Sequence, residues 1–178
     1  GPTPTFNEFL ARCNQPHVLM AYIGSLFIGE SYREQFVFMR GYGGDGKGSL
    51  IAALATAFGD SYQPVITIPH GDAKRFFTKN LLGKRFVAFP DLEDLKFLES
   101  DVYKSITGGD MVAIEGKGVD AKAGRLVCKT MVATNNRAQF RYSEATRRRI
   151  LGVLPDWLYD RFAVFSLRVD KKALPANL

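Results

Sequence analysis

The sequence predicts an α/β fold in which a mainly parallel sheet carries helices on both faces. Two short apolar segments, FVFM at 36–39 and RFVAF at 85–89, indicate strands that are buried on both faces. Each is followed by a loop of glycines or acids and then by apolar residues at helical spacing. Buried strands that alternate with helices are typical of parallel sheets. With 178 residues, of which 46% are hydrophobic, the chain can bury a sizeable core.

The N-terminal part of the chain is predicted to be helical. Apolar residues recur at spacings of three and four from Phe6 to Phe27, and Pro16 divides the pattern into two helices. Gly1 and Pro2 match the remnant that a tag-removing protease leaves, and they are set aside. We therefore expect a helical N-terminal segment, residues 3–30, that packs on a core of residues 31–178.

A glycine-rich loop follows the first predicted strand and reads GYGGDGKGS from Gly41 to Ser49. It matches the phosphate-loop template except at Gly48, where a hydroxyl is expected, and Ser49 supplies that hydroxyl one residue late. Because a helix is predicted from Ser49 to Phe58, its amide groups and dipole favour an anion, and Lys47 reaches the β- and γ-phosphates. We interpret the loop as a nucleotide site, the alternative being a plain turn. The candidate nucleotide-binding residues are Gly41, Gly43, Gly44, Asp45, Gly46, Lys47, Gly48 and Ser49.

Acidic residues follow the second buried strand. Upstream of it, the sequence predicts a strand at Pro64–Pro69 and a helix at Asp72–Leu82. Acids beyond a buried strand are typical of phosphate-loop ATPases, where one carboxylate holds Mg²⁺ through water and another polarises the attacking water. A polar loop that merely ends the strand is the alternative, and the division of roles stays open. The candidate catalytic acids are Asp91, Glu93 and Asp94, and the candidate Mg²⁺ ligands are Ser49, Asp91 and Glu93.

A basic β-hairpin is predicted after a helix at Leu95–Ile106. We expect it to span 111–131, with strand MVAI, tip EGKGVDAKAGR, and a returning strand RLVCKTMVAT that runs on to residue 134. Lys117, Lys122 and Arg125 in the tip suit contacts to nucleic-acid phosphates. Because the tip has no aromatic residue for stacking, we expect it to grip phosphates rather than bases.

Polar and basic residues follow the returning strand. Asn135 stands at its end, where an amide could sense a γ-phosphate, although a strand-ending turn is the alternative. A helix capped by Ser143 is predicted to run to Ile150 and to carry three arginines, 147–149. One of them could reach a neighbouring subunit's γ-phosphate, the alternative being a solvated helix end. A last strand is predicted at Phe162–Leu167.

The charge and composition of the chain indicate which kinds of partner and site are expected. The net charge is +6, and residues 117–149 hold nine Lys/Arg against two acids, which permits a polyanionic partner. Two distant cysteines and two histidines disfavour a disulfide framework, a metal cluster and histidine-based catalysis. No apolar run approaches a membrane span, and the start lacks a signal-peptide pattern, so a cytoplasmic location without membrane contact is expected.

Taken in order, these motifs resemble those of superfamily 3 helicases, the hexameric AAA+-type ATPases of small DNA viruses, phages and mobile elements. The chain looks closest to the helicase half of phage and plasmid primase-helicases. The resemblance covers roughly Ala21 to Phe165, and its most specific part is the segment Lys104–Lys117, which generic ATPases do not need. The motifs are YIGSLFIG, GYGGDGKGS, GKRFVAFPDLED, KSITGGDMVAIEGK, VATNN and TRRRI.

The resemblance implies an AAA+-like phosphate-loop core with ATP and Mg²⁺ as cofactors. It also implies ATP-driven translocation on single-stranded or fork DNA by a ring-shaped homo-oligomer, a hexamer, in a bacterial host's cytoplasm. A primase domain would belong to the same protein. Lys117 would grip DNA in the pore with help from Lys122, and Asn135 would align the attacking water. Arg148 or Arg149 would act as the arginine finger in trans.

Two departures from the family's pattern support an alternative function. Asp45 stands where the family often has Asn, which places a carboxylate near phosphates, and Gly48 displaces the hydroxyl. A nucleic-acid-binding module with a degenerate nucleotide site would carry both changes. A packaging ATPase is a further alternative, but it has no need of the basic hairpin. A small-molecule kinase is another, but it has no need of the hairpin or of the arginines at 147–149.

Overall fold

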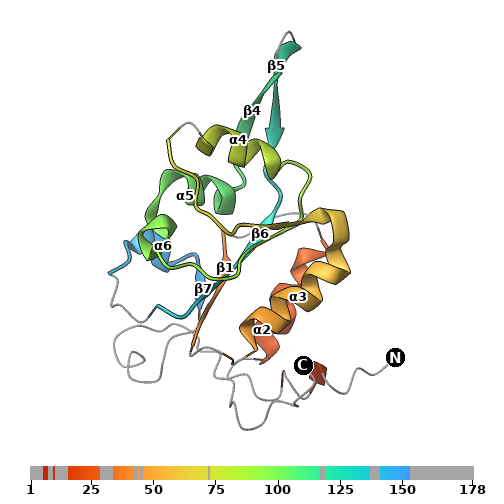
Figure 1. The fold of residues 1–178 in the computed structure, drawn as a ribbon, viewed down its shortest axis with the longest axis vertical. Helices are drawn as coiled ribbons and strands as arrows, with labels where there is room; N and C mark the ends of the chain where they lie inside the picture. The colour runs from red at the N-terminus through yellow and green to blue at the C-terminus, as the bar shows by residue number, and fades with distance from the viewer. Residues whose placement is uncertain are drawn as a thin grey trace.

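The computed structural model describes residues 6–7, 10, 16–28, 34–41, 44, 46–71, 73–116, 119–136 and 141–152. They form a parallel sheet of order β2-β3-β6-β1-β7 and a separate hairpin, β4-β5 (Figure 1). This confirms the α/β fold with a parallel sheet flanked by helices. The strands are β1 (Phe36–Arg40), β2 (Tyr62–Pro64), β3 (Phe86–Phe89), β4 (Met111–Gly116), β5 (Val119–Arg125), β6 (Lys129–Thr134) and β7 (Ile150–Gly152).

Helices cover both faces of the sheet, and none of those described is long and apolar enough to cross a membrane. On β1, Val37 and Met39 face the core that includes α2 and α3, while Phe36 and Phe38 face the core that includes η2 and α5. This alternation follows from the two-residue period of a strand. The helices are α2 (Pro16–Leu26), α3 (Lys47–Phe58), α4 (Ala73–Asn80), α5 (Asp101–Gly108) and α6 (Glu144–Arg147), with 3₁₀ turns η1 (Gly59–Ser61) and η2 (Leu95–Glu99).

Helix α2 is fastened to the sheet by hydrogen bonds as well as by apolar packing. The buried Tyr22 hydroxyl donates to the backbone oxygen of Thr130 at 2.7 Å, and Lys129 Nζ donates to the Ser25 carbonyl at 2.8 Å. The lysine satisfies one of the carbonyls that a helix leaves unpaired at its C-terminus. The boundary between the N-terminal segment and the core stays a prediction, because residues 29–33 lie outside the described part.

Two predicted elements in the middle of the chain differ from those observed. The strand expected at Pro64–Pro69 ends instead at Pro64, and Ile66 is 76% exposed. Strand β2 lies at the sheet edge, where a proline is tolerated, and the Val65 amide makes one more bond to β3 by donating to the Ala88 carbonyl at 2.8 Å. The helix expected from Leu95 to Ile106 is broken at Ser100, whose hydroxyl accepts from the Tyr103 amide and starts α5.

The helix expected from Ser143 to Ile150 is shorter than predicted. Ser143 caps it as expected, but α6 ends at Arg147, and Ile150 begins β7, which pairs with β1. Strand pairing overrides the local helical pattern here, because Ile150 is buried beside Phe36. The strand predicted at Phe162–Leu167 lies outside the described residues.

The predicted hairpin was wrong in its second strand. Beyond Arg125 the segment does not return along β4, because its residues Lys129–Thr134 form β6 in the middle of the main sheet. The strand that pairs with β4 is β5, which had been assigned to the tip. Its sequence, VDAKAGR, is poor in β-branched and aromatic residues, so it resembled a turn.

Candidate nucleotide site and nucleic-acid surface

Three motifs meet at the carboxyl edge of the sheet. β6 lies between β1 and β3, and all three strands are parallel, so the segments that follow them lie side by side. The amide of Gly41 donates to the Thr134 carbonyl at 3.3 Å, and the amide of Leu92 donates to the Ala133 carbonyl at 2.8 Å. The glycine loop, the acidic segment and the asparagine pair are thereby held at one place.

The glycine loop leads directly into α3. Gly44 and Gly46 adopt left-handed backbone angles, with φ of 75° and 90°, which only glycine adopts readily. Gly46 occupies the helix N-cap and has no side chain to cap the first amides. Those N–H groups and the helix dipole can therefore serve an anion. Gly43 and Asp45 lie outside the described residues.

Lys47 and Asn135 are joined across the site. Lys47 Nζ donates to Asn135 Oδ1 at 3.0 Å, although the two residues stand 88 positions apart in the chain. A lysine that binds a γ-phosphate and an amide that orients the attacking water must meet at the same point in space. The sequence predicted each role separately, and the fold brings the two side chains together.

The acidic segment gives its three carboxylates different positions. Asp94 Oδ1 accepts from the Lys96 amide at 3.0 Å and caps η2, so this carboxylate has a structural partner. Asp91 and Glu93 are exposed after β3. The backbone carbonyl of Glu93 accepts from Asn136 Nδ2 at 2.7 Å. This arrangement favours Asp91 and Glu93 over Asp94 for contact with a metal or a water molecule.

The residues predicted to hold Mg²⁺, which are Ser49, Asp91 and Glu93, lie in segments that follow the carboxyl ends of β1 and β3. Ser49 is in the first turn of α3, and Gly48 before it is exposed, with no atom within 4 Å of an added Cβ. The described part of the chain holds no group of three or more His, Cys, Asp or Glu that could hold a metal. Mg²⁺ at a nucleotide site takes ligands from the phosphates and water, and needs only one or two from the protein.

Arg148 and Arg149 lie at the amino end of β1, whereas the glycine loop follows its carboxyl end. The Phe36 amide donates to the Arg149 carbonyl at 2.9 Å, so these arginines sit at the amino end of the strand. Lys47 follows the carboxyl end, and the five residues of β1 span about 13 Å. Neither Arg148 nor Arg149 is placed beside Lys47 of its own chain.

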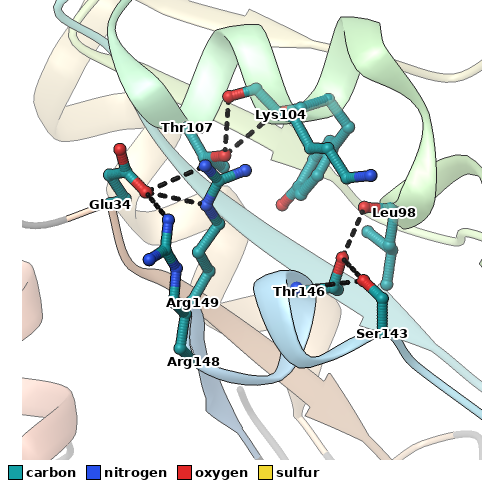
Figure 2. Close-up of polar contacts among 9 residues, drawn as sticks. Glu34, Leu98, Lys104, Thr107, Ser143, Thr146, Arg148 and Arg149 are labelled. Carbon is teal, nitrogen blue, oxygen red and sulfur yellow. Dashed lines mark hydrogen bonds and ion pairs between the residues drawn. The ribbon is translucent and has the colours of Figure 1, made fainter.

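Glu34 holds both arginines, as Figure 2 shows. Glu34 Oε2 accepts from Arg148 Nη2 at 3.1 Å and from Arg149 Nε at 3.0 Å. The hydrogen bond from Arg149, with the positive charges of both arginines, holds the pKa of the Glu34 carboxyl below its ordinary value. The Arg149 side chain is only 12% exposed, whereas that of Arg148 is 65% exposed. Arg148 is therefore the one of the two that presents its guanidinium to solvent.

A second carboxylate anchors the segment that carries the arginines. Glu99 at the end of η2 accepts from the Ser143 amide at 2.7 Å and from its hydroxyl at 2.6 Å. Partial burial raises the pKa of Glu99, but the Ser143 hydrogen bonds outweigh it, so the net pKa is lowered. Lys104 of α5 adds an ion pair at 3.8 Å. The arginine turn is thus tied to the core.

The hairpin projects from the body of the protein (Figure 1). Lys122 lies in β5 opposite Ile114, and Arg125 lies at the hairpin base opposite Met111. Arg125 Nε donates to the Gly109 carbonyl at 3.0 Å, so this arginine helps to fix the base. The expectation that all three basic residues occupy the tip was therefore wrong for Arg125, and Lys117 lies outside the described residues.

An exposed aromatic residue beside the hairpin was missed from the sequence. Phe76 is 70% exposed on α4, and α4 contacts β4. Met111, at the first position of β4, is 61% exposed. The helical spacing of α4 indicated one apolar face but could not show which phenylalanine stays in solvent, and it is Phe77 that packs into the core.

A protein-family model described as a family of unknown function, DUF5906, matches residues 39–149. The chain belongs to the DUF5906 family. The match includes the end of β1, the glycine loop, the acidic segment, the hairpin and the arginines. No match to this DUF5906 chain was found among curated proteins.

Solved structures share the fold of this DUF5906 chain. The C-terminal region of NrS-1 in its apo A form superposes with a TM-score of 0.58 at 17% identity, covering 85% of this chain and 41% of that one. A second apo structure of that region gives 0.58 at 14% identity, with 98% and 51% covered. A JCV helicase with a bound acetamide compound gives 0.55 at 13% identity, with 84% and 45% covered. The DUF5906 chain therefore has a helicase-like fold and spans about half the length of these proteins.

Proposed function

We propose that this DUF5906 chain is the ATPase core of a superfamily 3-type DNA helicase that translocates on single-stranded DNA. The observation that carries the proposal is the contact between Lys47 and Asn135 beside the exposed acids after β3. Phosphoryl transfer needs a cation on the transferred phosphate, a metal-binding carboxylate and a group that orients water. The carboxyl edge of this sheet supplies a candidate for each.

Each residue at the edge has a role in this proposal. The amides of the loop and of the first turn of α3 bind the phosphates, and Lys47 neutralises charge on the γ-phosphate. Ser49 and Asp91 would hold Mg²⁺, which would supply Lewis-acid stabilisation of the phosphate oxygens. Glu93 accepts a proton from the attacking water, and Asn135 orients that water. Lys47 turns from Asn135 toward the phosphate when nucleotide binds.

The site is completed by a neighbouring subunit. Arg148 is exposed and lies at the amino end of β1, so it reaches an active site only on another copy of the chain. We infer a ring in which Arg148 of one protomer contacts the nucleotide of the next. A single-strand displacement assay on a forked duplex with ATP tests the helicase proposal. Unwinding supports it, and ATP hydrolysis without unwinding would instead favour a packaging or structural ATPase.

DNA would bind along the hairpin and α4. Basic residues on β5 and in the tip meet phosphates, while Phe76 offers an exposed face on which a base can stack. This extends the expectation drawn from the sequence, which had phosphate contacts alone.

A second candidate function follows from Gly48. A nucleic-acid-binding module with a degenerate nucleotide site would retain the fold and the hairpin but lose the hydroxyl that binds Mg²⁺. Isothermal titration with Mg²⁺·ATP separates the two functions. Binding of ATP supports the ATPase, whereas DNA binding without ATP binding would support the module.

Ser49→Ala is expected to lower the rate of Mg²⁺-dependent ATP hydrolysis by about tenfold or more, since Mg²⁺ would lose the Ser49 hydroxyl as a ligand. Gly48→Ser is the matched control, because an added Cβ meets no atom within 4 Å and the fold accepts it. Steady-state hydrolysis across a Mg²⁺ titration checks both variants. Wild-type activity in Ser49→Ala would show that the Ser49 hydroxyl has no role in ATP hydrolysis.

Single-stranded DNA binding is expected to fall steeply with salt. If Lys117, Lys122 and Arg125 each meet one phosphate, the log–log slope is about −2, or about a twentyfold loss between 50 and 200 mM salt.

Phe76→Ala should weaken binding about fivefold or more at every salt concentration, because stacking does not release counterions. Phe27→Ala, an exposed phenylalanine after α2, is the control. Fluorescence anisotropy measures the binding of single-stranded DNA by the unaltered chain and by both phenylalanine variants. A flat salt response in the unaltered chain would contradict the phosphate contacts.

A further inference from the structure

We propose that Asn136 is a positioning residue that holds the acidic segment at the nucleotide site. This inference rests on the proposed ATPase function and deepens it. Asn135 points toward Lys47 and belongs to the reacting groups. Its neighbour Asn136 makes a different set of contacts, to Thr134 and Arg40 through its main chain and to Glu93 through its side chain. Asn136 lies in the motif VATNN, in which only Asn135 was assigned a role.

Asn136 links the turn after β6 to β1 and to the acidic segment through hydrogen bonds. Its amide N–H donates to Thr134 Oγ1 at 3.0 Å, which fixes the turn after β6. Its carbonyl accepts from Arg40 Nε at 2.8 Å, and Arg40 is the last residue of β1, directly before the glycine loop. Its side-chain Nδ2 donates to the Glu93 carbonyl at 2.7 Å. The residue therefore lies between the phosphate loop and the acidic segment.

The Arg40 contact is protected from solvent. Arg40 is only 6% exposed, and Thr134 is 1% exposed, so the turn at Asn136 has a rigid base on the β1 side. A charged donor in a buried position makes a strong hydrogen bond to a carbonyl. Because the Arg40 contact holds the Asn136 main chain in place, the Asn136 side chain donates to the Glu93 carbonyl from a fixed position.

The acidic segment depends on few other attachments to β6. Glu93 is exposed, and the bond from the Leu92 amide to the Ala133 carbonyl ties the segment one residue earlier. Removing the Asn136 amide group frees the Glu93 main chain to shift, and misplacement of a reacting group by about 1 Å can cost about a hundredfold in rate. An aspartate at 136 would do more harm, since its carboxylate faces a carbonyl oxygen and cannot donate.

The test compares Asn136→Ala and Asn136→Asp with Asn80→Ala, which makes the same change at an exposed position at the end of α4. DNA-stimulated kcat and KM, affinity for a non-hydrolysable ATP analogue, and the thermal midpoint are measured. We expect both Asn136 variants to lose about tenfold or more in kcat with unchanged analogue affinity and thermal midpoint. Asn80→Ala should match the unaltered chain. Wild-type kcat in Asn136→Ala, or a joint loss of affinity and thermal midpoint in both Asn136 variants, would overturn the inference.

A second measurement asks whether Asn136 acts through Glu93. In single-turnover hydrolysis, Asn136→Ala should add little further loss when Glu93→Gln is already present, because both changes disable one group. A full, additive loss would overturn the positioning role. Failure of the proposed function is distinguishable, since the unaltered chain would then hydrolyse no ATP at all, with or without DNA.

Discussion

Replacing Lys47 with alanine is expected to lower DNA-stimulated ATP hydrolysis by about a hundredfold or more. The lysine is the cation placed at the glycine loop and beside Asn135, so its loss removes stabilisation of the charge that develops on the transferred phosphate. One such preorganised donor is commonly worth about 3–4 kcal/mol in an enclosed site. The measurement is kcat at saturating Mg²⁺·ATP and single-stranded DNA.

Lys84→Ala is the matched control for this variant. Lys84 Nζ donates to the Asp60 carbonyl near the amino end of β3, at the opposite edge of the sheet from the site. Its removal is expected to leave kcat unchanged. Full DNA-stimulated hydrolysis in Lys47→Ala would show that the glycine loop is not the phosphate site.

Replacing Arg148 with alanine is expected to lower kcat by about a thousandfold while the affinity for a non-hydrolysable ATP analogue changes little. Arginine fingers contribute about 10³–10⁵ in rate because they stabilise charge that appears only in the transition state. Both arginines are ion-paired to Glu34, but Arg148 is favoured because its side chain is 65% exposed, whereas that of Arg149 is 12% exposed. Arg149→Ala should instead lower the thermal midpoint.

Mixing the two inactive variants tests whether the finger acts between subunits. A Lys47→Ala protomer retains Arg148 and can supply it to an Arg148→Ala protomer, whose loop is intact. The mixture should therefore regain part of the wild-type rate, although each variant alone is inactive. A mixture that stays inactive while both variants still assemble would contradict a shared site.

Local patterns predicted the parts of the fold that depend on local physics. The buried strands β1 and β3 appeared as short apolar runs because both of their faces are covered by helices. Helix α3 was predicted from the apolar residues at Ser49–Phe58, and it starts two residues earlier, at Lys47. Ser143 was recognised as a cap because its hydroxyl needs only the amide three residues later.

Other features depend on pairings that no local pattern contains. β5 is held by its partner β4 rather than by its own propensity, so it resembled a tip. Asp94 could not be separated from Asp91 and Glu93 until its bond to the Lys96 amide was visible. Likewise, Glu34 meets Arg148 across 114 positions, and nothing in the sequence around Glu34 points to an arginine partner.

The most direct test of a shared, DNA-stimulated ATPase site is hydrolysis measured against protein concentration, with and without single-stranded DNA. If Arg148 completes the site of a neighbour, the rate per protomer rises with concentration as protomers associate, and single-stranded DNA raises it further at each concentration. A rate per protomer that stays constant across the whole range and does not respond to DNA would contradict both the shared site and the helicase proposal.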